Sequence, residues 1–174
     1  NRGVTYGELG RYEEAVRDLE HAIQLDPKYT WAMNNLGLLY TSMKDYPKAL
    51  QAFDLALKTD PKYKWAAANK GRAYKSDGAY EKAIEAFASA IEIDQDYAWA
   101  FAQRGTIYYL MQDYSNAIDD FTQALKLDET EFWVFGERAR AYYDIKNIPA
   151  TVSDLNRLIE LGDGKNSWAI TALS

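Results

Sequence analysis

The sequence lacks cysteine, and its 174 residues include only one histidine and four prolines. Without cysteine the chain cannot form disulfides, a zinc-thiolate site or a thiol nucleophile, so small disulfide-stapled secreted domains are excluded. A long hydrophobic run is also missing. The longest uncharged stretch, residues 29–43, is shorter than the roughly 20 apolar residues that a membrane-spanning helix needs. We therefore expect no membrane span.

Basic residues are fewer than acidic ones. Lysine and arginine total 20 against 26 acidic residues, which gives a net charge of -6 and argues against a nucleic-acid-binding protein. The glycines are too scattered for a phosphate-binding loop. His21 occupies a position that holds Leu55, Ser89, Gln123 or Arg157 at the repeat offset described next, so we expect it to face solvent. The sequence predicts no catalytic site, no cofactor and no metal site, and hence no enzyme.

What the sequence does have is a repeat of 34 residues. Trp31, Trp65, Trp99 and Trp133 are each 34 residues apart, and Trp168 follows after 35. The same offset relates a series of small and aromatic residues: Gly37, Gly71, Gly105 and then Ala139; Tyr40, Tyr74, Tyr108 and Tyr142; Ala49, Ala83, Ala117 and then Thr151; Phe53, Phe87, Phe121 and then Leu155. Such a period is typical of stacked repeats that bury their surfaces against one another.

We expect one array with five copies and part of a sixth. The first copy is truncated at residues 1–29, the next four occupy residues 30–63, 64–97, 98–131 and 132–165, and a partial helix follows at 166–174. The chain is then a fragment of a longer array.

Each copy is expected to fold as two helices. Met33, Leu36 and Tyr40 recur at intervals of three and four, which is the period of a buried helical stripe, and the second half of the copy repeats this pattern. Gly37 on the first helix and Ala49 on the second are small enough to let the two backbones approach closely.

The motif Leu36-Gly37-x2-Tyr40, followed by Ala49-x3-Phe53-x2-Ala56 and Pro61, resembles the tetratricopeptide repeat. The resemblance covers nearly the whole chain. It implies an all-α fold, an α-solenoid of stacked helix-turn-helix repeats that forms a right-handed superhelix, with the first helices lining a concave groove. The tryptophans lie two positions before the family's usual site, and the fifth copy is the most degenerate.

The stripe opposite the buried one on each first helix would then face a bound partner. It supplies the candidate peptide-binding residues: Trp31, Asn35, Leu38, Trp65, Asn69, Arg72, Lys75, Trp99, Gln103, Thr106, Trp133 and Arg140.

Two sets within this stripe have distinct chemistry. Asn35, Asn69 and Gln103, the amide ladder, can hydrogen-bond the backbone of an extended peptide whatever its sequence, or they can bond neighbouring helices. The four tryptophans, the tryptophan ladder, offer large apolar faces to a partner. Alternatively, they pack against the tyrosine that lies two residues before three of them and cement successive repeats.

Charge divides between the two layers of helices. The first helices, taken as residues 30–43, 64–76, 98–111 and 132–145, sum to +5, which leaves -11 for the rest. We expect Lys70 and Arg104 to lie off the groove, so that Arg72, Lys75 and Arg140 supply its usable charge. This favours extended segments of a partner protein that contain acidic residues. The family's carboxylate-clamp pattern, which grips acidic C-terminal peptides, is not matched.

The leading hypothesis is a non-enzymatic scaffold that binds an extended peptide segment of a partner protein in its concave groove. One alternative is a regulatory or sensor arm of a larger signalling ATPase or transferase that contacts its own other domains. Another is end-to-end self-association through the cut ends of the array. Cytoplasmic localisation is a default expectation, and neither a membrane nor a nucleic-acid partner is expected.

Overall fold

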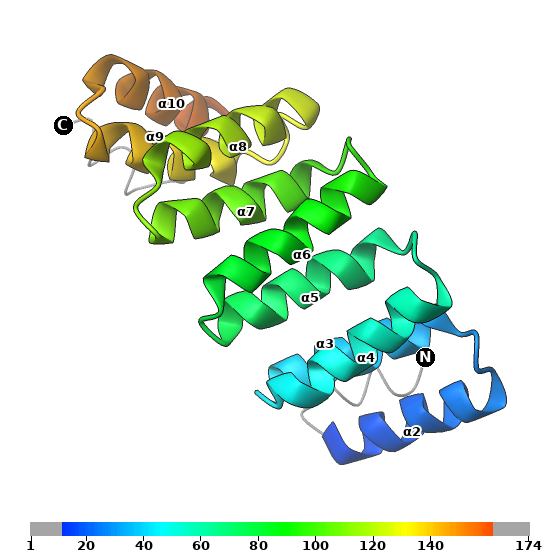
Figure 1. Cartoon of the computed structure of the whole chain (residues 1–174). Helices are drawn as coiled ribbons and strands as arrows, with labels where there is room; N and C mark the ends of the chain where they lie inside the picture. The colour runs from blue at the N-terminus through cyan, green and yellow to red at the C-terminus, as the bar shows by residue number, and fades with distance from the viewer. Residues whose placement is uncertain (1–11, 162–174) are drawn as a thin grey trace. The chain divides into compact units, whose positions relative to one another are not determined.

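The fold is built from short helices that alternate along the chain. The structure, a computed structural model, describes residues 12–161. In this range every regular element is an α-helix, and no strand occurs (Figure 1). The helices are α2 (Tyr12–Leu25), α3 (Thr30–Ser42), α4 (Tyr46–Thr59), α5 (Lys64–Ser76), α6 (Tyr80–Ile93), α7 (Ala98–Leu110), α8 (Tyr114–Leu127), α9 (Trp133–Asp144) and α10 (Ile148–Leu161).

The chain divides into two compact units, Asn1–Asp94 and Gln95–Ser174, called unit 1 and unit 2 below. In unit 1, α3 pairs with α4 and α5 with α6, while α2 packs on α3, and α5 packs on both α3 and α4. In unit 2, α7 pairs with α8 and α9 with α10, and α9 also packs on α7 and α8. Both units are therefore stacks of helix-turn-helix repeats, which confirms the predicted all-α solenoid class. The division of residues 1–174 into six copies of one array stays a prediction.

In the pairs α3–α4, α5–α6 and α7–α8, a phenylalanine on the second helix packs against a glycine on the first. Phe53, Phe87 and Phe121 are all fully buried. A methyl group added to Gly37 would lie 2.5 Å from Cε1 of Phe53, so only glycine leaves room for the ring. The ring thus packs inside its own helical pair, where it sets the approach of the two helices.

The turn inside each pair needs a residue in the left-handed region. Gly78 has φ 80°, and its equivalents Lys44, Gln112 and Lys146 have φ of 61°, 63° and 62°. A positive φ therefore recurs at this turn, although glycine occupies it only once among the described residues.

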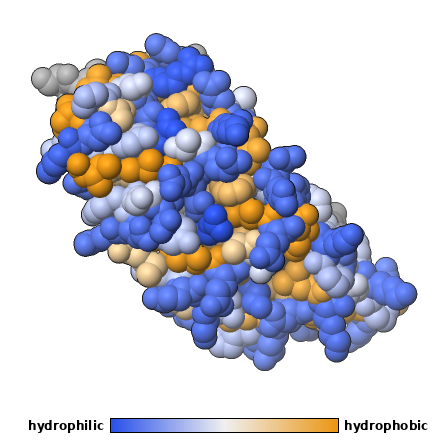
Figure 2. Space-filling view, turned by 45° about the horizontal axis from the view of Figure 1, so that its top comes forward, coloured by the Kyte–Doolittle hydropathy of each residue, from blue (hydrophilic) through white to orange (hydrophobic). Residues whose placement is uncertain are grey.

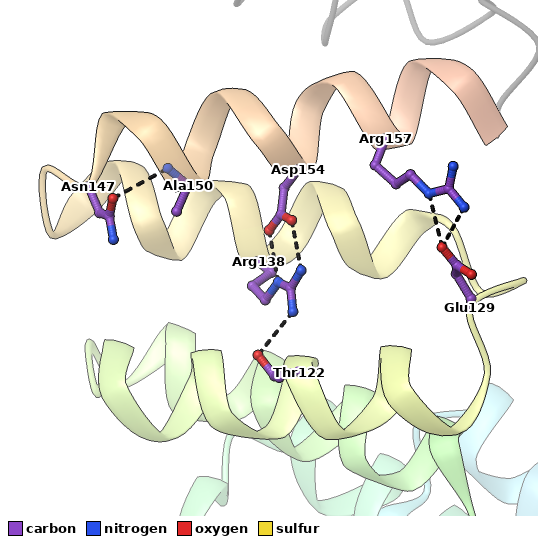
Figure 3. Close-up of polar contacts among 7 residues, drawn as sticks. All are labelled: Thr122, Glu129, Arg138, Asn147, Ala150, Asp154 and Arg157. Atoms are coloured by element: carbon purple, nitrogen blue, oxygen red, sulfur yellow. Dashed lines mark hydrogen bonds and ion pairs between the residues drawn. The ribbon is translucent and has the colours of Figure 1, made fainter.

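Unit 2 also contains two buried arginine–aspartate pairs. Arg138 on α9 donates from Nε and Nη2 to both carboxylate oxygens of Asp154 on α10, at 2.8 and 2.7 Å, and from Nη1 to Oγ1 of Thr122 on α8 at 3.0 Å (Figure 3). Arg104 holds Asp120 in the same two-pronged way, with both distances 2.7 Å. Because it reaches toward the second helix, Arg104 lies off the groove-facing stripe, as expected.

The surface of the described helices carries both polar and apolar residues (Figure 2). Polar and charged residues cover much of the face seen in Figure 2, and hydrophobic residues show between them. No helix within residues 12–161 combines the length and the apolar character that crossing a bilayer requires.

Candidate functional site

A cavity of about 440 Å³ opens on unit 1, where the first helices α3 and α5 pack together. We call it the unit-1 pocket, and its lining residues are Trp31, Asn34, Asn35, Leu38, Tyr63, Trp65 and Asn69. Five of these belong to the predicted peptide-binding set. Asn34 and Tyr63 were not predicted. None of the seven carries a charge.

Hydrogen bonds orient the carboxamides of this pocket. Asn69 on α5 donates from Nδ2 to Oδ1 of Asn34 on α3 at 2.9 Å, and Asn34 is only 6% exposed. Asn35 donates from Nδ2 to the carbonyl of Trp31, one turn earlier, at 2.7 Å. Both bonds join an amide to another group of the protein. The first is the alternative role given above for these amides, a hydrogen bond between neighbouring helices. A carboxamide has two N–H donors and two acceptor lone pairs, so each retains further capacity.

The Asn34–Asn69 bond leaves one polar group of each amide outside it, the amino group of Asn34 and the oxygen of Asn69. No fully buried side-chain nitrogen or oxygen in the described part of the chain lacks a hydrogen-bond partner. The oxygen of Asn34 accepts from Asn69, which leaves the Asn34 amino group to donate elsewhere. The Asn34–Asn69 pair therefore presents both a donor and an acceptor at the pocket.

Aromatic side chains also line the unit-1 pocket. Tyr63 and Trp65 have ring centroids 5.1 Å apart at an interplanar angle of 58°, and Trp65 is 50% exposed. Tyr29 and Trp31, one repeat earlier, stack at 5.7 Å and 21°. The tyrosines thus do pack against the tryptophans, yet half of Trp65 stays open. The Nζ atom of Lys64 lies 5.2 Å from the ring centroid of Trp65 and also pairs with Asp94.

Positive charge lies beside the pocket rather than in it. Arg72 and Lys75 follow Asn69 on α5, at one and nearly two turns' distance, and Arg72 is exposed. Both make further interactions within the protein. Lys70 instead turns to the second helix α4, where it pairs with Asp54 at 2.6 Å. Helix α5 itself contains no acidic residue.

The predicted residues of unit 2 are more scattered. Trp99 packs against Tyr97 at 5.9 Å, Gln103 is half-buried, and Thr106 donates its hydroxyl to the carbonyl of Ala102 at 2.9 Å. Trp133 has no preceding tyrosine and donates its indole N–H to Glu131. These residues line neither the unit-1 pocket nor the cavity described next.

Arg140 lies in a cavity of about 320 Å³ in unit 2, and its Nη1 donates to Glu137 at 3.0 Å. The cavity is lined by Tyr109, Ala139, Arg140, Tyr143, Asp144, Thr151 and Leu155. Tyr109 donates its hydroxyl to Asp144 at 2.9 Å. Burial, together with this bond to a carboxylate, raises the pKa of Tyr109 to about 12. This cavity was not predicted from the sequence.

The described residues include no group of three histidine, cysteine or carboxylate side chains placed to hold a metal ion. His21 is exposed on α2, as predicted.

The sequence matches models of one family. Models described as tetratricopeptide repeat match residues 1–62 and 98–131, and a model described as TPR repeat matches residues 71–112. No curated protein matches the chain.

Solved structures resemble it in fold. The crystal structure of MamA has 19% sequence identity and a TM-score of 0.82, covering 96% of this chain and 98% of that one. PilF from Pseudomonas aeruginosa has 22% identity and a TM-score of 0.83, covering 96% of this chain and 76% of that one. YrrB, described as a TPR protein with an unusual peptide-binding site, has 18% identity and a TM-score of 0.75, covering 98% and 87%.

Proposed function

The chain belongs to the tetratricopeptide repeat family, and we propose that it binds an extended peptide segment of a partner protein in the unit-1 pocket. The coarser conclusion is that it is a protein-interaction module. The finer one, that the partner is held as an extended peptide on the first helices, is developed below from the pocket itself.

The observation that carries the proposal is the Asn34–Asn69 hydrogen bond across α3 and α5. This bond already holds both amide side chains in one conformation, so binding a ligand costs little further side-chain entropy. Together they offer one donor and one acceptor, which match the C=O and N–H of a peptide backbone. Recognition of the backbone does not depend on the peptide's sequence, and the exposed face of Trp65 adds an apolar contact for a side chain.

The charge of α5 favours acidic residues in the peptide. Arg72 and Lys75 follow the uncharged pocket along α5, so a carboxylate beside the bound backbone gains attraction without being buried. We extend the proposal to the same register of unit 2, where Trp99, Gln103, Thr106, Trp133 and Arg140 would contact a partner. The peptide-binding site described for YrrB belongs to that protein, and it is a precedent for such binding in this fold.

The test begins with a displayed library of random peptides selected on the full chain. Selected peptides are synthesised with capped ends and titrated by calorimetry into the wild type, Trp65→Ala and Asn69→Ala. Each variant removes a contact at the pocket, so we expect dissociation constants at least about tenfold larger, as for residues at the centre of an interface.

The matched control is Gln51→Ala. Gln51 is an exposed amide on α4, the second helix of the repeat that contains Asn34, and its loss should leave affinity unchanged. Thermal unfolding of all variants must match the wild type. The proposal is overturned if no peptide is selected, or if the selected peptides bind Trp65→Ala and Asn69→Ala as well as they bind the wild type.

A further inference from the structure

The unit-1 pocket has a chemistry that narrows its ligand. It combines aromatic faces, an uncharged lining and fixed carboxamides. We propose that it recognises a polyproline II segment with two prolines three positions apart and acidic residues on either side. This inference rests on the proposed function, because it names the class of peptide that the same pocket holds.

Spacing is the first argument. Trp31 and Trp65 hold the same register on α3 and α5, and these helices pack directly on each other. Packed helices lie about 8–10 Å apart. A polyproline II chain rises about 3.1 Å per residue with three residues per turn, so its equivalent side chains recur about every 9.3 Å. A ligand that crosses the two helices would therefore place one side chain at each aromatic pair.

A β-strand does not match this spacing. Its side chains on one face recur every two residues, about 6.6–6.8 Å apart, and the side chain three positions along points to the opposite face. An extended strand could therefore contact one tryptophan well but not both in register.

Hydrogen bonding is the second argument. A polyproline II backbone has no internal hydrogen bonds, so its carbonyls are exposed acceptors, and proline itself has no N–H to satisfy. The pocket can supply several donors. The Asn34 amino group is directed away from its bond with Asn69, and Asn35 and Asn69 each have a second amide hydrogen.

Apolar contact and charge complete the match. A proline ring can pack on the exposed half of Trp65, whose ring tilts at 58° to Tyr63 and has the Nζ atom of Lys64 5.2 Å from its centroid. None of the seven lining residues is charged, whereas Arg72 and Lys75 lie further along α5. Charge complementarity thus favours uncharged residues within the pocket and carboxylates beside it.

The experiment compares three capped peptides on the full chain by calorimetry. The first has acidic ends and two prolines three positions apart, the second has the same composition with the prolines two positions apart, and the third has alanine in place of both prolines. We expect the second and third to bind about tenfold more weakly than the first. Indole N–H signals of Trp31 and Trp65 should shift with the first peptide.

Two variants locate the effect. Trp65→Ala should remove the preference for the first peptide. Tyr143→Ala, which removes an equally exposed aromatic from unit 2, should retain it.

The outcomes separate the two proposals. Equal binding of all three peptides, weakened by Trp65→Ala, would overturn the proline inference and leave peptide binding standing. The inference also fails if none of the three binds while library-selected peptides do. If neither these nor any library peptide binds, both proposals fail.

Discussion

At the scale of single residues, three helical pairs depend on a match between a glycine and an aromatic ring. The distance from an added methyl to the nearest ring atom is 2.5 Å at Gly37, 2.8 Å at Gly71 and 3.0 Å at Gly105. The fifth copy instead has Ala139 with Leu155. A smaller side chain on the second helix thus accompanies the larger one on the first, which keeps the pair packed.

We predict that Gly37→Ala destabilises the chain. The methyl would overlap Phe53, whose ring is fully buried and cannot move aside. Overpacking costs roughly 1–3 kcal/mol, and the better helix propensity of alanine returns about 1 kcal/mol. We expect a net loss of up to about 2 kcal/mol in the free energy of unfolding, measured by urea denaturation. Gly105→Ala should cost less because its gap is wider.

A double variant tests the size match itself. Gly37→Ala with Phe53→Leu reproduces the pair found in the fifth copy. The combined cost should be smaller than the sum of the two single costs by about 1 kcal/mol, because the leucine relieves the overlap. Strictly additive costs would contradict this explanation.

The role of Asn34 in the candidate site could not be predicted from the sequence. The helical period assigned its neighbour Met33 to the buried stripe, where it lies, and Asn35 to the opposite stripe, where it is half-buried. Asn34 lies between the two stripes, and its role depends on Asn69, 35 positions away in the chain. Only the stacking of α3 on α5 brings them together, and no spacing rule within one helix predicts that contact.

At the scale of elements, helix type and approximate bounds could be predicted well. Glycine, alanine and phenylalanine at a fixed offset specify which faces pack, and α5, for example, begins at Lys64, where the third copy was expected to start. The unit-2 cavity could not be predicted. It occurs in the degenerate fifth copy, where Ala139 and Leu155 replace the usual pair, and a departure from the pattern carries no information on how the helices adjust.

One contact between elements should be visible in alkaline solution. Tyr109 on α7 donates to Asp144 on α9, and burial, followed by this bond, raises the pKa of Tyr109 from 10.0 to about 12. The folded state therefore holds this proton more tightly than the unfolded state does. The resulting stability is fully present below pH 10 and is lost as the pH rises toward about 12.

We predict that Asp144→Asn lowers the pKa of Tyr109. The carboxylate that opposes ionisation is removed, while the burial that also raises the pKa remains, so the pKa should fall only part of the way to 10.0. The measurement is the ultraviolet absorbance of tyrosinate, taken as the difference between each protein and its own Tyr109→Phe derivative. An unchanged titration would show that the α7–α9 contact does not form in solution.

At the scale of the whole molecule, the two units differ in what holds their helical pairs together. Unit 2 contains Arg104–Asp120 and Arg138–Asp154, and both carboxylates are buried. At the positions of these aspartates unit 1 has Ala52 and Ala86, which are also buried. A repeat protein's stability is approximately a sum of local terms, so loss of one ion pair should be felt mainly in its own unit.

We therefore predict that Asp154→Ala loosens α9 and α10 but not α3 and α4. The substitution leaves the largely buried guanidinium of Arg138 without its carboxylate, and breaking such a pair costs about 3–5 kcal/mol. Amide hydrogen exchange in α9 and α10 should accelerate at least about a hundredfold. Exchange in α3 and α4 should match the wild type.

The matched control is Glu129→Ala. It breaks the ion pair between Arg157 and Glu129, which lies nearby but is solvent-exposed (Figure 3). Exposed pairs contribute about 0–1 kcal/mol, so exchange should change little anywhere. If Asp154→Ala accelerates α3 and α4 as much as α9 and α10, the chain unfolds as one cooperative body, and the two units are a division of its contacts and not of its stability.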